Sequence, residues 1–179
     1  MFNLAQAMQA IDDALATKPV GAAALDWNTK VPFDTSLVGH LVAQYRELNA
    51  QFEGLIYKLE SDPAGAGHAV RECAEALHKL RHEESLRLYP VIARGLSSDP
   101  ITRRLFWQSR LVMLGLARRV FRRFDELARA IRSKTEVATA ADHAAKALAE
   151  YRRRNEAEMY LLYDLIGQRS TIGKGSRVA

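Results

Sequence analysis

The sequence has few of the residues that cross-link a fold or interrupt helices. Its 179 residues include one cysteine, Cys73, and five prolines. A single cysteine excludes an internal disulfide framework and agrees with a reducing cytoplasm. The low proline count and the 48% of hydrophobic residues are typical of a helical protein. The length suits one domain with a substantial core.

Several functional signatures are also missing. The first residues lack the basic start and continuous apolar run of a signal peptide, and no stretch reaches membrane-spanning length. There is no Gly-rich phosphate loop after a strand, no nucleophile elbow and no Ser/His/Asp arrangement among sequence neighbours. We therefore expect a cytoplasmic, non-enzymatic protein without a membrane partner.

Positive charge is concentrated in one segment. The formal net charge is +5, but residues 101–132 alone carry nine arginines against two acids. Four of these arginines have i, i+4 spacing and are candidates for anion binding: Arg118, Arg119, Arg122 and Arg123. The alternative is a solvated helix face balanced by acids of a neighbouring helix. We expect a protein or anionic small-molecule partner rather than nucleic acid, because no aromatic interleaving or nucleic-acid motif accompanies the arginines.

Apolar residues at helical spacing predict four long helices joined by short connections. The first begins after Asp34 or Thr35 and is stopped by residues 61–68, and the others cover about 68–92, 101–132 and 137–167. Such helices pack as an all-α, antiparallel up-down-up-down four-helix bundle. We expect this bundle over residues 34–167, an N-terminal helix and arm over 1–33, and a disordered tail over 168–179.

One segment occurs twice in the chain. Residues 74–92 align without a gap on residues 148–166, which places Glu84 on Glu158 and Tyr89 on Tyr163. Both glutamates fall on the predicted core row of a helix, where an unpaired carboxylate is expensive. Metal ligation, pairing with arginine, or an exposed end of the bundle would explain them.

Each repeated glutamate precedes a Leu-aromatic pair, which is followed by Pro90 in the first copy. This pattern resembles the hemerythrin-like, or HHE cation-binding, family over residues 34–167. In that family the glutamates help to ligate a di-iron centre, together with histidines from all four helices. The resemblance implies a bacterial-type four-helix bundle with Glu84 and Glu158 at the ligand positions.

The histidines that this family uses are missing here. Leu80 and Arg154 occupy the positions expected for histidines on the second and fourth helices. On the third helix, Gln108 and Ser109 occupy the positions of the family's Glu-His pair. His40 on the first helix lies about 100° from the apolar row at 3.6 residues per turn. We therefore expect a degenerate metal site and no cofactor. The alternative is an iron-binding oxygen, nitric oxide or redox sensor that uses Glu84, Glu158 and His40.

If the metal is lost, the glutamates need other partners. Arg81, Arg110 and Arg154 flank the two core rows and could pair with either carboxylate. We expect a hydrogen-bonded polar interior that would fix helix register more than it stabilises the fold. Its predicted members are Glu84, Glu158, Asn155, Ser109, Tyr45 and Tyr151.

The remaining histidines allow two further interpretations. Glu75, His78 and His82 have metal-ligand spacing, but they point away from the core row of their helix, so they form an exposed stripe or an alternative surface metal site. Residues 78–81, His-Lys-Leu-Arg, are similar to the motif of histidine phosphotransfer proteins, although His82 replaces the glycine expected there.

Taken together, these patterns predict a regulatory protein that binds a ligand or partner. The arginine block and the arm around Trp27 are the candidate contact surfaces. The amphipathic helix at residues 3–16 could dock on its own bundle or on a second copy in a homodimer.

Overall fold

The computed structural model describes residues 31–97 and 100–175. Within these ranges the chain is helical and contains no strand. None of the described helices is both long enough and apolar enough to cross a membrane. The predicted helix at 3–16 and the arm with Trp27 lie outside the described residues.

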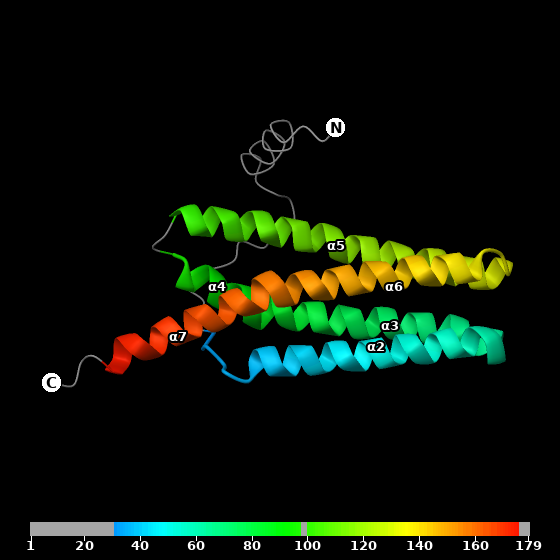
Figure 1. The fold of residues 1–179 in the computed structure, drawn as a ribbon, viewed down its shortest axis with the longest axis horizontal. Helices are drawn as coiled ribbons and strands as arrows, with labels where there is room; N and C mark the ends of the chain where they lie inside the picture. The colour runs from blue at the N-terminus through cyan, green and yellow to red at the C-terminus, as the bar shows by residue number, and fades with distance from the viewer. Residues whose placement is uncertain (1–30, 98–99, 176–179) are drawn as a thin grey trace, which may run out of the picture.

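Figure 1 shows long helices running side by side along the longest axis of the molecule. α2 packs on α3 and α5 packs on α6, while α3 also contacts α5 and α2 also contacts α6. The α2–α3 and α5–α6 connections lie at one end, and α4, α7 and the start of α5 lie at the other. The elements are α2 (Leu37–Ser61), α3 (Pro63–Glu83), η1 (Glu84–Leu88), α4 (Tyr89–Gly95), α5 (Pro100–Ser133), α6 (Val137–Arg154), η2 (Asn155–Tyr160) and α7 (Leu161–Gly175).

One residue separates α2 from α3. The Asp62 side chain accepts a hydrogen bond from the Gly65 backbone N–H at 3.0 Å, and Pro63 begins the helix. This is a typical helix start. The capping oxygen accepts a backbone N–H that has no partner within the helix, and proline suits the first position because it has no N–H to satisfy. The prediction that residues 61–68 form a break was therefore wrong, since α3 already includes most of them.

The predicted core rows of the first two long helices are confirmed, except for Leu59 in the last turn of α2, which is only partly buried. Cys73 belongs to this core and is fully buried, and burial raises the pKa of its thiol to about 11. The thiol is therefore protonated at neutral pH and acts as a small apolar group. The buried residues of the two rows are Leu37, Leu41, Tyr45, Leu48, Phe52, Leu55, Val70, Cys73, Leu77, Leu80, Glu84, Leu88 and Val91.

The core row of the last helix changes at η2, a short π-helix. A regular α-helix would place Glu158, Leu162 and Ile166 in the core. Ile166 is buried, but Glu158 and Leu162 are only partly buried, and the other large buried side chains after Asn155 are Met159, Tyr160 and Tyr163. A π-helical turn takes up an extra residue, so the following side chains rotate relative to the α-helical pattern. α7 extends to Gly175, into the segment 168–179 that we expect to be a tail.

Candidate functional site

Glu84 is the centre of a buried polar cluster. Its side chain is 1% exposed, yet both carboxylate oxygens accept hydrogen bonds. Tyr151 Oη donates to Oε2 at 2.8 Å, while Tyr160 Oη and Asn155 Nδ2 donate to Oε1 at 2.9 and 3.1 Å. Three donors replace much of the water that the carboxylate loses on burial, as a buried acid requires.

The cluster extends from Asn155 to α2. Asn155 Nδ2 also donates to Tyr45 Oη at 3.0 Å, so this amide nitrogen connects the tyrosine of α2 with the carboxylate of η1. The Tyr45 and Tyr151 rings lie 6.0 Å apart, within the range of favourable ring contacts. The cluster therefore joins α2, η1, α6 and η2 at one level of the core.

Both π-helical segments contribute to this cluster. η1 supplies Glu84, whose carbonyl accepts the backbone N–H of Tyr89 five residues later, and η2 supplies Asn155 and Tyr160. Tyr160 is the member that the sequence did not predict. A strict α-helical period places it off the core row, and only the π-helical turn brings it in. Short π-helical segments are uncommon and often occur at functional sites.

Burial determines the protonation of the cluster. Loss of water around Glu84 raises the pKa of its carboxyl to about 7, although the Tyr151 and Tyr160 hydrogen bonds and the Arg81 charge act in the opposite direction. The pKa of the Tyr151 phenol is raised well above its ordinary value, first by burial and then by the charge of Glu84. The tyrosines therefore remain protonated donors, while Glu84 exchanges its proton near neutral pH.

The second glutamate of the repeat has a different environment. Glu158 Oε1 lies 2.6 Å from Arg154 Nε, and its side chain is 30% exposed. The prediction that it occupies the core row was wrong, because η2 rotates it toward the side of the helix. Pairing with Arg154 was among the predicted arrangements. Arg110 instead lies over the rings of Tyr89 and Trp107 at 5.1 and 5.0 Å.

The three predicted metal ligands, Glu84, Glu158 and His40, do not form one site. His40 is half exposed and lies 3.2 Å from Glu83, not beside Glu84 or Glu158. Gln44 Nε2 donates to Glu83 at 3.1 Å, which completes a small polar group between α2 and α3. Ser109 is half-buried, and no hydrogen bond is found that joins it to the Glu84 cluster within the described part of the chain.

The other histidine set lies on the surface. Glu75, His78 and His82 are exposed, as the helical period predicted. The His78 ring stacks on Phe121 of α5, with ring centroids 4.2 Å apart. Across residues 31–97 and 100–175, no group of three or more His, Cys, Asp and Glu side chains is arranged to hold a metal ion.

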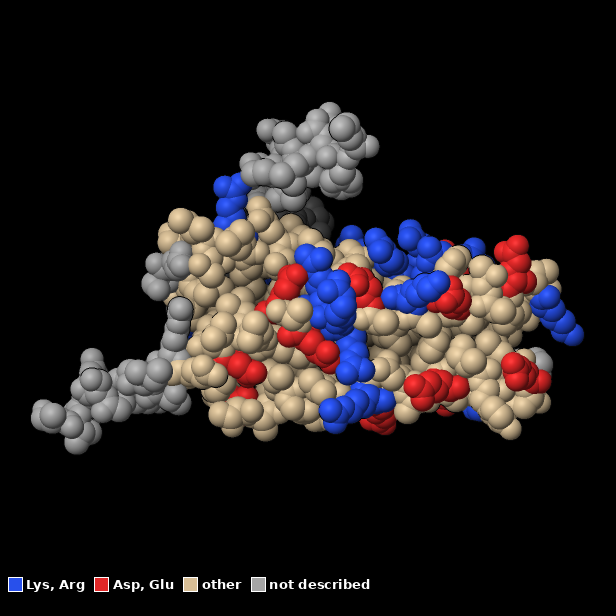
Figure 2. Space-filling model, viewed as in Figure 1, with Lys and Arg blue, Asp and Glu red and all other residues tan. Residues whose placement is uncertain are grey.

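The four arginines of the predicted anion-binding block differ in exposure. Arg118, Arg119 and Arg122 are exposed, whereas Arg123 is half-buried and lies 2.5 Å from Glu126. Arg122 Nε also lies 3.9 Å from Glu126, but its side chain remains largely exposed. Figure 2 shows basic side chains gathered along the upper edge of the molecule, where Figure 1 places α5. The exposed arginines, Arg118, Arg119 and Arg122, are called the arginine stripe below.

The same helix exposes apolar side chains nearer its start. Leu105 is 57% exposed, Ile101 is 75% exposed, and Leu111 and Val112 are each 43% exposed. Exposed apolar side chains that cluster on one element often mark a binding surface. The sequence pattern did not identify this feature, because these residues lie beside the apolar row that faces the core.

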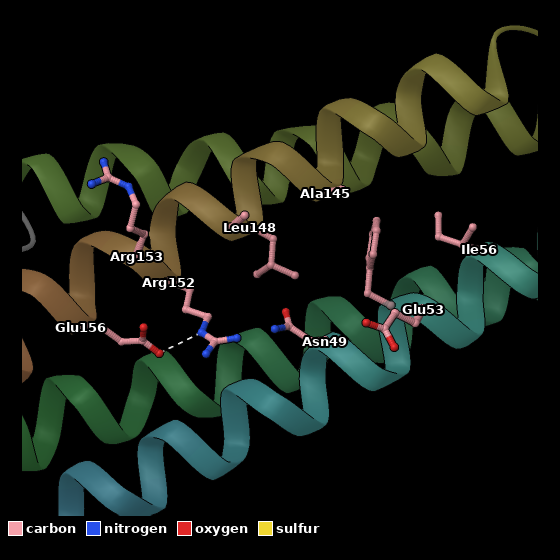
Figure 3. Close-up of a pocket in the computed structure, with 10 residues that line it drawn as sticks. Asn49, Glu53, Ile56, Ala145, Leu148, Arg152, Arg153 and Glu156 are labelled. Atoms are coloured by element: carbon pink, nitrogen blue, oxygen red, sulfur yellow. Dashed lines mark hydrogen bonds and ion pairs between the residues drawn. The ribbon is translucent and has the colours of Figure 1, made fainter.

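A shallow groove runs between α2 and α6 (Figure 3). Its volume is about 590 Å³, and its floor includes Phe52 and Leu148. At its rim, Arg152 Nε donates to Glu156 at 2.8 Å, and this contact is the dashed line in Figure 3. Because its lining includes two arginines and two glutamates, the groove shows no preference for one sign of charge.

Comparisons of the chain with protein-family models, curated proteins and solved structures find no match.

Proposed function

We propose that this protein is a cytoplasmic, non-enzymatic regulator built as an antiparallel up-down-up-down four-helix bundle of hemerythrin-like type. The Glu84 cluster takes the place of the di-iron centre and has no cofactor. The support for this role is that Tyr151, Tyr160 and Asn155 already donate to both carboxylate oxygens. Such a network orients the helices around it and favours one packing of the core.

The regulator acts by binding an acidic protein segment or an anionic small molecule through α5. The observation that carries this proposal is the arginine stripe, three exposed guanidinium groups within five residues. Arginine presents a planar set of donors that suits carboxylates and phosphates. The apolar side chains of Leu105 and Val112, exposed on the same helix, would add contact area for a protein partner.

Isothermal titration with two anionic probes tests this binding. Inorganic tripolyphosphate represents a small anion, and a poly-glutamate peptide represents an acidic protein segment. We expect the variant Arg118→Ala/Arg119→Ala/Arg122→Ala to lose at least about tenfold in affinity for the preferred probe, and the wild-type affinity to fall as salt rises.

A matched variant controls for net charge. Arg46, Arg71 and Lys79 are also exposed but lie on α2 and α3, so replacing all three with Ala removes the same charge elsewhere. Affinity in this control should remain within about twofold of wild type. An equal loss in both variants, or no binding of either probe, would refute the proposal.

The alternative functions predict different measurements on untagged protein. A metal sensor would contain near-stoichiometric iron by elemental analysis and would lose it in Glu84→Gln/Glu158→Gln. A phosphotransfer protein would acquire acid-labile phosphate at His78 when mixed with phosphorylated receiver domains. Either result would replace the partner-binding proposal.

A further inference from the structure

The outer face of α5 has an apolar part followed by a basic part. Leu105, Leu111 and Val112 are large apolar side chains that are 57%, 43% and 43% exposed. Leu105, Val112 and Arg119 follow one another at intervals of seven residues, and Leu111 and Arg118 are also seven residues apart. Seven residues are close to two helical turns, so the members of each set lie along one line of the helix. The apolar part therefore continues directly into the arginine stripe.

This face points away from the core of the bundle. The buried residues of α5 are Phe106, Met113, Ala117, Val120, Phe124 and Leu127. At 3.6 residues per turn, Val112 and Arg119 lie about 100–120° from the centre of this buried row, and Leu111 and Arg118 lie about 140–160° from it. α5 also forms one edge of the described bundle (Figure 1). A partner can therefore contact both parts without displacing a described helix.

The basic part of the face has arginines without acidic partners. Within the described part of the chain, no ion pair of 4 Å or less joins Arg118 or Arg119 to an acid. The charge of Arg119 acts on Glu150 from a greater distance, but that carboxylate is already held by Arg153 at 2.8 Å. Arg118 and Arg119 are therefore available to the acids of another molecule.

The charge of the face decides against a second copy of this chain as its partner. Residues 101–132 carry nine arginines and two acids. Whichever way two of these faces are paired, arginines of one copy meet either arginines or apolar side chains of the other. Neither arrangement provides a counter-charge, whereas an acidic partner is attracted by the same arginines.

Gly115 lies between the apolar and basic parts. It is exposed, and a Cβ added there would meet no atom within 4 Å. Because the distance between two packed helices depends on the side chains at their contact, a partner helix can approach the α5 backbone closely at this glycine. From Leu105 to Arg122 the face is about 26 Å long, which a helix of about 18 residues would cover.

We propose that the protein partner binds the outer face of α5 with an amphipathic helix that is acidic at its N-terminal end, apolar toward its C-terminal end and antiparallel to α5. Acids stabilise the N-terminal turn of a helix, so a helix with this order of residues is favoured. Because α5 runs from apolar to basic, only the antiparallel direction places those acids on the arginines. This inference rests on the proposed function and specifies its partner.

Two designed peptides test the order of the two parts. The matched peptide has about 18 residues, with glutamates in its first turns and leucines at helical spacing in the remainder. The shuffled peptide has the same composition, but its glutamates and leucines are mixed along its length. In isothermal titration with the full chain, we expect the matched peptide to bind at least about tenfold more tightly, because only it meets both parts of the face.

Variants of exposed residues locate the contact. Leu105→Ser/Val112→Ser removes apolar area and keeps the arginines, so the preference for the matched peptide should fall below about twofold. Leu161→Ser/Leu165→Ser is the matched control, because these leucines are 56% and 46% exposed on α7, and it should retain the preference. A nitroxide at the N-terminus of the matched peptide should broaden the amide NMR signal of Arg122 more than that of Leu105.

Three outcomes would overturn the inference. Equal affinity for the two peptides, or an equal loss of preference in both double variants, would mean that the order of the face is not recognised. Stronger broadening at Leu105 than at Arg122 would contradict the antiparallel direction. Binding of phosphatidylserine vesicles that Leu105→Ser/Val112→Ser abolishes, without any peptide preference, would assign the face to a membrane.

Failure of the proposed function has a different result. If tripolyphosphate, poly-glutamate and the matched peptide all fail to bind, the proposed function is refuted. If poly-glutamate binds through the arginine stripe but the matched peptide shows no preference over the shuffled one, the inference about the partner helix is refuted alone.

Discussion

The two copies of the repeated segment carry the same glutamate in different surroundings. Glu84 is 1% exposed and accepts three hydrogen bonds, whereas the Glu158 side chain is 30% exposed and pairs with Arg154. The sequence offset that superimposes the glutamates does not superimpose their partners. The difference therefore lies in the donors that the opposite copy provides.

The donors of Glu84 come from the second copy, at Tyr151, Asn155 and Tyr160. The corresponding positions in the first copy are Leu77, Arg81 and Leu86, which supply no hydroxyl or amide group. A glutamate turned inward from the second copy would thus lack neutral hydrogen-bond donors at these positions. Both copies of the repeat therefore contain the glutamate, but only the second copy contains the neutral hydrogen-bond donors that allow a carboxylate to be buried.

The largest difference between the copies should appear on truncation of Glu84. Glu84→Ala leaves three buried donors without their acceptor and opens a cavity, so we expect a loss of about 4 kcal/mol in the free energy of unfolding. Urea denaturation at pH 7 measures this loss. A loss below about 1 kcal/mol would mean that the cluster contributes little to the fold.

The pH dependence of stability should also depend on Glu84. Its folded pKa of about 7 exceeds the ordinary value of 4.5, so between these values the folded state keeps a proton that the unfolded state releases. The free energy of unfolding therefore falls as pH rises through this window, by roughly 3 kcal/mol from this one group, and levels off above the folded pKa.

Comparison with Glu84→Gln between pH 5 and 8 isolates this contribution, because the other titrating groups are common to both proteins. Glu158→Gln is the matched control and should retain the wild-type slope. If Glu84→Gln shows the same slope as wild type, the carboxyl does not titrate in this range.

A smaller effect is expected from Tyr160, the donor that η2 brings into the core. Tyr160→Phe removes a hydrogen bond to the charged form of Glu84, so we expect a loss of about 1–2 kcal/mol at pH 8. The pKa of Glu84 should rise further, which moves the pH window upward. Tyr163→Phe is the control, because Tyr163 bonds the Asp34 backbone and should leave the window unchanged.

The smallest effect should come from Glu158. Its ion pair with Arg154 is partly exposed, and pairs of this kind contribute at most about 1 kcal/mol. We expect Glu158→Ala to remain within that limit, and double-mutant cycles with Arg154→Ala to show less coupling as salt is raised. A loss as large as that of Glu84→Ala would contradict the distinction between the copies.

The sequence predicted the helices and the first part of the core because an apolar period persists through α2 and α3. It also predicted that Glu84, Asn155, Tyr45 and Tyr151 would share one polar interior. It could not predict the inward position of Tyr160, since a π-helical turn depends on packing across the core rather than on a local residue pattern. The start of α3 was missed because the glycines after Pro63 indicated a loop, while the Asp62 cap favours a helix.

A π-helical turn also has a genetic consequence. Loss of one codon within η2 would remove the extra residue and return the segment to regular α-helix. The later side chains would keep their present faces, because Tyr163 would then take the position that a regular α-helix places in the core. Insertion of one residue at such a point is therefore a route by which a helix can gain a buried group without turning the side chains that follow it.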